Sequence, residues 1–210
     1  MTRKPWDLAF TAEPTEVAVL RRAMRLHLGI WGLHHVTDEA QLCVSELASN
    51  VITHVGQGTP ATLAVAMNGV HLRIEVHDPD TRALPTLLDA NADAEGGRGM
   101  ALVDAVAARW GVQLRVDRKV TWCELTTGLT SPNGHVEGPG VRRAEALLDF
   151  YAGEKPPPLR PGHGRLGRAV SEESVITLIT DFLHWLRAHG RDVDEALDRA
   201  QARYDAELDG

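Results

Sequence analysis

The sequence predicts an α/β domain followed by a helical extension, on three observations. A helix-period apolar pattern spans residues 40–55, an Asn68-Gly69 pair separates two strand-like runs, and a glycine-rich segment at 96–99 precedes a second helical pattern. Helical and strand-like periods alternate in this way over roughly the first 130 residues. A sheet packed against helices is therefore the expected architecture of this part of the chain.

Local signals predict the elements of the first half of this domain. Residues 6–10 form a short strand-like run, and Pro14 suits the first turn of a helix that extends to about Trp31. Thr37 is the expected N-cap of the central helix, which carries the first apolar pattern and is expected to end at Gly56 and Gly58. The next two runs, 61–67 and 71–78, flank Asn-Gly, which is the strongest two-residue hairpin signal, so they are expected to be antiparallel neighbours.

The second half of the domain begins with residues 79–96, which lack periodicity and predict a long functional loop. The helical pattern that follows is expected to extend from Met100 to Trp110 and to end at Gly111. Residues 112–116 and 119–127 then read as a second antiparallel pair of strands.

The chain divides into three predicted segments. Residues 1–130 form the α/β domain, 131–170 form a linker with a short helix, and 171–210 form a helical hairpin that begins at Ser171. The apolar faces of the hairpin predict packing on the α/β domain, on a protein partner, or on a second copy of the chain as a homodimer. The pattern leaves these three alternatives open.

Composition restricts the class of protein. The 210 residues include 22 Lys and Arg against 29 Asp and Glu, which gives a net charge of -7 and argues against direct nucleic-acid binding. No apolar run is long enough for a secretory signal or a membrane span. The two cysteines cannot build a disulfide framework and predict small apolar core residues. A cytoplasmic protein without a membrane partner is expected.

The predicted central helix carries the first candidate site residues. Glu46, Asn50 and His54 are spaced four residues apart and form a polar seam along one edge of the apolar arc. A seam at the rim of a buried stripe can line a pocket. For a Glu-x-x-x-Asn pair taken alone, an ordinary surface rim is the simpler interpretation.

Two further features favour a nucleotide. The glycine-rich segment exposes backbone N–H groups at the positive end of a helix, which suits an anion, and Arg98 adds a cation for a terminal phosphate. Asp78, at the end of a buried strand, can accept a hydrogen bond from an exocyclic amine. Taken singly, a flexible loop and a turn-forming Asp before Pro79 explain the same residues.

In their order along the chain, these pieces resemble the N, G1 and G2 boxes of the GHKL ATPase superfamily, which includes gyrase, Hsp90 and histidine kinases. The resemblance covers roughly residues 6–128. The phrases Ser45-Glu-Leu-Ala-Ser-Asn50, Gly97-Arg-Gly-Met-Ala-Leu-Val103 and Trp110-Gly-Val112 are similar to bacterial anti-sigma-factor serine kinases and related ATP-binding regulators. The resemblance implies a Bergerat-type two-layer α/β sandwich, with helices on one face of a mixed, mostly antiparallel sheet.

The resemblance also implies ATP and Mg²⁺ as cofactors and a role for each site residue. Glu46 is the implied general base, Asn50 the Mg²⁺ ligand, and Asp78 the acceptor for the adenine amine. The implied nucleotide-binding set is Asn50, Asp78, Gly97, Arg98, Gly99 and Met100.

Two positions depart from the family pattern. Asp80 stands where the first G1 glycine is expected, so the loop beneath the adenine is expected to differ. Lys119 stands where a Thr often begins the last strand, and Thr121 is the candidate substitute for its water-mediated adenine contact.

The expected function is an ATP-dependent protein serine/threonine kinase of anti-sigma-factor type. It would phosphorylate a small anti-anti-sigma-like partner and bind a sigma factor. The alternative is a nucleotide-switched regulatory binding module without kinase activity. Glu46 supports catalysis without identifying a protein substrate, so the sequence leaves both open.

Overall fold

The computed structural model describes residues 2–81, 98–152 and 165–208. The chain separates into two compact units, Met1–Gly134 and His135–Gly210. Within the described residues, none of the helices is both long enough and apolar enough to cross a lipid bilayer.

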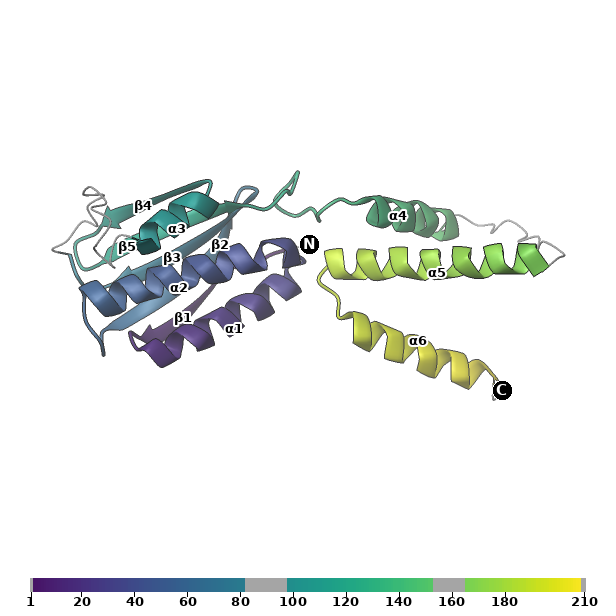
Figure 1. The fold of residues 1–210 in the computed structure, drawn as a ribbon, viewed down its shortest axis with the longest axis horizontal. Helices are drawn as coiled ribbons and strands as arrows, with labels where there is room; N and C mark the ends of the chain where they lie inside the picture. The colour runs from purple at the N-terminus through teal and green to yellow at the C-terminus, as the bar shows by residue number, and fades with distance from the viewer. Residues whose placement is uncertain (1, 82–97, 153–164, 209–210) are drawn as a thin grey trace. The chain divides into compact units, whose positions relative to one another are not determined.

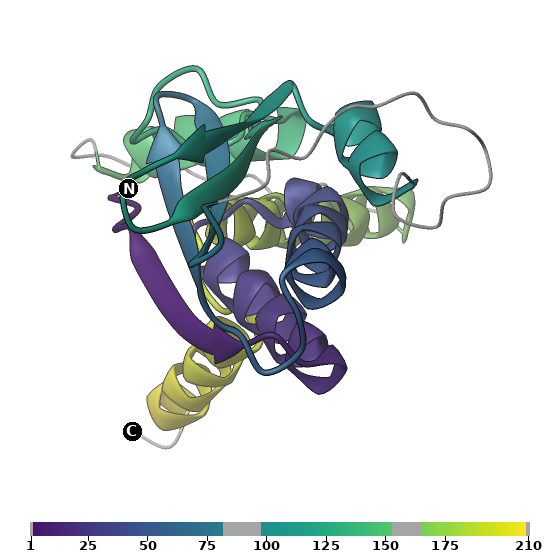
Figure 2. The ribbon, with the colours of Figure 1, turned by 90° about the vertical axis from the view of Figure 1, so that its left-hand side faces the viewer.

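The first unit is a two-layer α/β sandwich, as predicted. Its five strands pair antiparallel throughout, in the order β1-β2-β3-β5-β4, and helices α1, α2 and α3 cover one face of the sheet (Figures 1 and 2). The elements of this unit are β1 (Trp6–Thr11), α1 (Pro14–Ile30), the 3-10 helix η1 (His34–Val36), α2 (Thr37–His54), β2 (Pro60–Asn68), β3 (His71–Asp78), α3 (Arg98–Val106), β4 (Arg109–Leu114) and β5 (Lys119–Thr126).

Helix α2 lies at the centre of the core. It contacts the helices α1 and α3 on either side and the strands β3 and β5 of the sheet beneath. Its predicted apolar arc is confirmed, since all five residues inside the helix are buried: Ala40, Val44, Leu47, Ala48 and Val51. Burial of each of the valine and leucine side chains in this set stabilises the fold by roughly 1.5–3 kcal/mol. The rim of α2 is therefore fixed in place relative to the sheet.

The predicted N-cap of α2 is wrong. Thr37 is the first residue of the helix and its side chain makes no capping hydrogen bond. The 3-10 helix η1 runs directly into α2, and the backbone N–H of Thr37 donates to the carbonyl of His34. Because the preceding turn supplies a backbone acceptor, no side-chain cap is required at this position.

The predicted β2–β3 hairpin is confirmed. Asn68 pairs with His71 across a two-residue turn, and Gly69, the first turn residue, has φ 60°. Glycine adopts this left-handed conformation without the steric cost that a Cβ would bring. In β3, buried residues alternate with half-buried ones and end at Asp78, which places the Asp78 side chain on the helix-covered face.

Trp110 and Gly111 lie in β4, although the helical pattern had been expected to continue through Trp110. Helix α3 ends at Val106, and the N–H of Ala108 already donates to the carbonyl of Glu124 in the sheet. A Cβ on Gly111 would lie 3.0 Å from Cζ2 of Trp122, its partner on β5. Glycine at position 111 therefore leaves room for the Trp122 ring. The sheet thus overrides the helical spacing of the apolar residues.

A buried carboxylate organises the other face of the sheet. Glu124 is fully buried, and it accepts hydrogen bonds from Asn68 and Arg73, each at 2.8 Å, and from Arg109. Arg73 also lies over the Trp122 ring, 4.1 Å from its centroid. Burial alone would raise the pKa of Glu124, but the hydrogen bonds from Asn68, Arg73 and Arg109 outweigh it and lower that pKa.

Replacing Glu124 by alanine is expected to destabilise the first unit by about 3 kcal/mol, because it leaves Arg73 without its buried partner. Since the pKa of Glu124 is lower in the folded chain than in the unfolded one, its stabilisation is present at neutral pH and is lost as the pH falls through the folded-state pKa. Urea unfolding monitored by circular dichroism measures the effect. Glu75, whose side chain is 24% exposed, is the matched control, and Glu75→Ala is expected to cost less than about 1 kcal/mol. Equal losses for the two variants would contradict this assignment.

The second unit is helical and contains α4 (Pro139–Ala152), α5 (Arg165–Ala188) and α6 (Val193–Leu208). Helices α4 and α5 contact each other, and Arg143 on α4 donates two hydrogen bonds to the Asp181 carboxylate on α5, at 2.7 and 2.6 Å. Asp181 is 4% exposed, so this bidentate pair is a fixed contact between the two helices.

Helix α5 begins earlier than predicted. It starts at Arg165, so Ser171 lies inside the helix and is not its N-terminal start. No proline lies between Arg165 and Ser171, and Leu166 and Ala169 are strong helix formers, so the local sequence permits the helix to begin at Arg165 although Gly167 disfavours it.

Candidate functional site

The first turn of α3 lies against the predicted polar seam of α2. A Cβ on Gly99 would lie 2.5 Å from Oε2 of Glu46 and 3.8 Å from Oδ1 of Asn50. The first of these distances is shorter than any real carbon–oxygen contact of this kind, so any side chain at position 99 would displace the Glu46 carboxylate. Glycine at this position therefore permits the backbone of α3 to approach both polar groups.

The amide of Asn50 has a defined orientation. Its Nδ2 lies 3.1 Å from Sδ of Met100, which accepts the hydrogen bond, and Met100 is 8% exposed. Because the amide nitrogen is engaged by the sulfur, the oxygen Oδ1 is the atom that remains to meet a ligand. An amide oxygen is a suitable ligand for Mg²⁺, which prefers oxygen donors.

The N-terminus of α3 adds a partial positive charge beside these side chains. The helix is nine residues long and its axis dipole places the positive end at Arg98 and Gly99. Backbone N–H groups at such an end bind phosphate oxygens, and they also favour the Glu46 carboxylate. The backbone of Arg98 opens the helix, whereas its side chain, Gly97 and residues 82–96 of the predicted loop lie outside the described residues.

Asp78 occupies the end of β3 and is 2% exposed. Its Oδ1 accepts a hydrogen bond of 3.0 Å from the backbone N–H of Asp80, and its Oδ2 lies 3.5 Å from Nζ of Lys119. Burial raises the pKa of Asp78 above its usual value, although the Asp80 N–H and the Lys119 ammonium oppose this effect. A carboxylate that has lost its water in this way gains from any further hydrogen-bond donor.

Lys119 lies beside the Asp78 carboxylate, a contact that the sequence did not predict. In the sheet it lies directly opposite Asp78, and it is 6% exposed. Thr121, the candidate substitute for the missing threonine, is likewise buried and lies opposite Val76, on the same face as Lys119. The lysine that departs from the family pattern is thus the cross-strand partner of Asp78. The sequence showed that a lysine stands at this position in place of the usual threonine. That this lysine pairs with Asp78 follows only from the register of β3 and β5.

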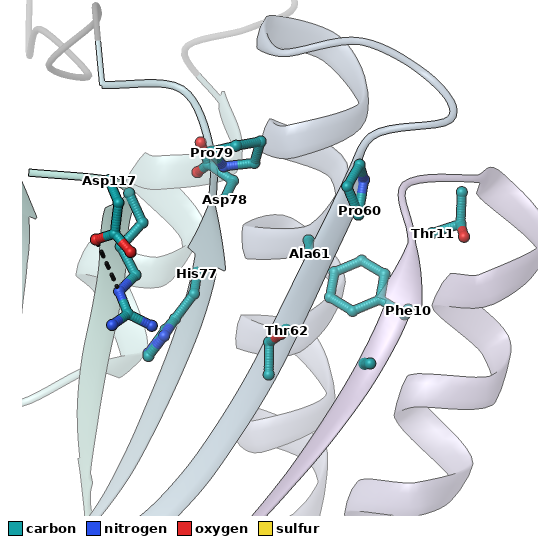
Figure 3. Close-up of a pocket in the computed structure, with 11 residues that line it drawn as sticks. Phe10, Thr11, Pro60, Ala61, Thr62, His77, Asp78, Pro79 and Asp117 are labelled. Carbon is teal, nitrogen blue, oxygen red and sulfur yellow. Dashed lines mark ion pairs between the residues drawn. The ribbon is translucent and has the colours of Figure 1, made fainter.

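A depression of about 470 Å³ lies at the ends of β1, β2 and β3 (Figure 3). Thr62 and His77 line it from neighbouring strands, with the Asp117–Arg118 ion pair beside them. Thr62 and His77 belong to the half-buried face of the sheet, whereas Asp78 alternates with them and belongs to the helix-covered face. Asp78 and the next residue, Pro79, nevertheless line the depression, whereas Asn50 is not among its lining residues, so the depression adjoins only the Asp78 part of the predicted nucleotide-binding set.

The described residues thus place the predicted site in two parts. Glu46, Asn50, Gly99 and Met100 form one cluster between α2 and α3. Asp78 lies on β3, which α2 also contacts, with its carboxylate on the same face of the sheet as the helices. Both parts adjoin α2, and residues 82–97 of the connecting chain lie outside the described residues.

Residues 10–123 match the family model of the histidine kinase-like ATPase domain, which is more than half of the chain. The chain belongs to the histidine kinase-like ATPase family. The match includes every predicted site residue from Glu46 to Met100 and ends within β5. This histidine kinase-like ATPase is therefore an ATP-binding protein of GHKL type, in agreement with its α/β sandwich.

A relative in Streptomyces coelicolor, described as an uncharacterized protein, is 50% identical to this ATPase over 84 residues. The aligned part covers 39% of this chain and 79% of the relative. The similarity therefore extends over most of the relative.

Proposed function

We propose that this histidine kinase-like ATPase is a protein serine/threonine kinase of anti-sigma-factor type. It transfers a phosphoryl group from ATP to a hydroxyl on a small anti-anti-sigma-like partner, and it binds a sigma factor. The observation that supports the proposal most directly is the position of Gly99, against which both the Glu46 carboxylate and the Asn50 amide oxygen lie.

In the proposed reaction, Glu46 acts as general base. Its carboxylate takes the proton from the attacking hydroxyl, which raises the nucleophilicity of that oxygen. Glu46 and Asn50 are one helical turn apart on the rigid helix α2, so the base and the metal ligand keep a constant separation. Positioning of this kind is the main protein contribution to phosphoryl transfer.

Asn50 is the proposed Mg²⁺ ligand. Its oxygen is free to coordinate because Met100 holds the nitrogen, and the N–H groups of α3 are placed to receive phosphate oxygens. Bound Mg²⁺ would offset the negative charge that develops on the transferring phosphoryl group. Asp78 is the proposed acceptor for the adenine amine, and the ammonium of Lys119 opposes the rise in the pKa of this carboxyl group that burial causes.

The test is transfer of labelled phosphate from ATP to candidate partner proteins. Glu46→Ala is expected to lower the rate by about 100-fold or more while ATP binding persists, because a general base contributes about 10²–10⁴-fold. Glu39→Ala is the matched control, since Glu39 is exposed on the same helix. Transfer that survives in Glu46→Ala would contradict the assigned base. Tight ATP binding with nucleotide-dependent partner affinity and no transfer by the wild type would instead establish the alternative, a regulatory switch without kinase activity.

A further inference from the structure

Three side chains of types that can bind a metal ion meet in the second unit, which contains none of the residues of the predicted nucleotide site. His135 precedes α4, Glu145 lies on α4, and His189 follows α5 directly. Each offers a ligand atom, and these atoms all lie within 4.8 Å of one another. The three come from separate segments of the unit, so the fold brings them together.

His189 is oriented for metal binding by its surroundings. Its Nδ1 lies 2.8 Å from the backbone carbonyl of Trp185, and its ring stacks on the Trp185 ring with centroids 4.1 Å apart. A carbonyl oxygen can only accept, so Nδ1 carries the proton and Nε2 keeps its lone pair. Metal-binding histidines are typically held in this way, with the second ring nitrogen donating to a carbonyl or carboxylate.

His135 supplies a second nitrogen without a complete set of partners. Its Nε2 is shielded from solvent and makes no aligned hydrogen bond within the described parts of the chain. It nevertheless lies 3.1 Å from Oε1 of Glu145. A buried nitrogen left in this state costs about 1–3 kcal/mol. Two ligands of one metal ion lie side by side, and their lone pairs point at the ion and not at each other. The His135–Glu145 pair, which is close but makes no aligned hydrogen bond, has this arrangement.

We propose that His135, Glu145 and His189 form a zinc-binding site in the second unit. Zinc bonds to histidine nitrogen and carboxylate oxygen at about 2.0–2.2 Å, so neighbouring ligand atoms in a tetrahedral site are about 3.3 Å apart. The His135–Glu145 separation of 3.1 Å already matches this spacing, and the rings of His135 and His189 are 4.4 Å apart between centroids. Two nitrogens and one oxygen suit zinc better than Mg²⁺ or Ca²⁺, which prefer oxygen.

The proposed ion connects the entry to α4 with the end of α5. The described residues of the unit provide three ligands, so a water molecule would complete a tetrahedral coordination. The ion would bind the folded unit and not the unfolded chain, so zinc would raise the free energy of unfolding of the helical unit. At zinc concentrations above the dissociation constant, this increase grows with the logarithm of the zinc concentration. This site is independent of the proposed kinase reaction, so the two proposals can fail separately.

The test is a calorimetric titration of zinc chloride into the full chain after treatment with a chelator. We expect one zinc ion per chain. In His189→Ala we expect the zinc affinity to fall about 100-fold. Removing a hydrogen-bond partner of a metal ligand already lowers metal affinity by about 10–100-fold, and removing the ligand itself should lower it at least as much. Glu145→Gln keeps the shape of the side chain and is also expected to weaken binding. His184→Ala is the matched control, since His184 is exposed on α5, and its affinity is expected to match the wild type.

Two further measurements distinguish loss of a zinc ligand from misfolding of a variant. Far-ultraviolet circular dichroism reports the helix content of each variant, and Co²⁺ bound in place of zinc gives a visible absorption spectrum characteristic of tetrahedral coordination. Absence of saturable zinc binding by the wild type would overturn the proposal. So would wild-type affinity in Glu145→Gln and in both His135→Ala and His189→Ala, since binding would then belong to other histidines of the surface.

Discussion

Replacing Asp78 by asparagine is expected to abolish ATP binding by the full chain. The Asp78 carboxylate is buried and dehydrated, so a hydrogen bond from the adenine amine replaces solvation that it has lost. An asparagine side chain presents an NH₂ group in place of one oxygen, and that group would face Lys119 or the adenine amine, both of which are donors. Isothermal titration calorimetry with ATP measures the loss.

The same substitution also affects folding, and a double variant separates the two effects. Asp78→Asn leaves the buried Lys119 without its anionic partner, which is expected to cost about 3 kcal/mol. Adding Lys119→Met removes the unpaired charge and is expected to recover most of that stability in urea unfolding. The double variant should then be folded and still fail to bind ATP. Binding of wild-type strength by the double variant would exclude Asp78 as the adenine acceptor.

Replacing Gly99 by alanine is expected to lower the rate of ATP turnover by about 100-fold or more with little effect on stability. The new methyl group would displace Oε2 of Glu46, from which its position is 2.5 Å away. The Glu46 carboxylate lies at the end of a flexible side chain, so it can move aside. Alanine is also the better helix former by up to about 1 kcal/mol. The fold is expected to survive, whereas Glu46, the proposed general base, would leave its position.

ATP hydrolysis measured as phosphate release tests this prediction without a protein partner, because water can replace the attacking hydroxyl. Gly29→Ala in α1 is the matched control, since a Cβ there would meet Cε1 of His34 at an ordinary 3.5 Å. We expect wild-type hydrolysis from Gly29→Ala and unchanged urea midpoints, within about 1 kcal/mol, from both variants. Full activity in Gly99→Ala would show that the placement of Glu46 against α3 has no part in the reaction.

Much of the first unit was predictable because its signals are local. The apolar arc of α2 follows directly from helical spacing, and Asn68-Gly69 determines a hairpin with few alternatives. The polar seam of Glu46 and Asn50 was visible for the same reason. The structure adds that Gly99 lies close against both, a contact that depends on how α3 packs on α2.

The failures come from tertiary structure. Trp110 continues the helical spacing of α3, but pairing with β5 draws it into the sheet. Lys119 became the partner of Asp78 only through the register of β3 and β5, which no local pattern specifies. His189 is distant in the sequence from His135 and Glu145, and it meets them only when the helices of the second unit pack. In each case a contact between residues that are distant in the sequence determines the local structure or the cluster that forms. Local periodicity carries no information about such contacts.

The central claim is that Asn50 and the N-terminus of α3 hold the phosphates and metal of ATP beside Glu46. Calorimetric titration of ATP into the full chain, with and without Mg²⁺, tests it most directly when the wild type is compared with Asn50→Ala. We predict saturable binding by the wild type, one ATP per chain, that strengthens when Mg²⁺ is present, and binding by Asn50→Ala that no longer responds to Mg²⁺. An Mg²⁺ response of wild-type size in Asn50→Ala, or no ATP binding by the wild type, would contradict the claim.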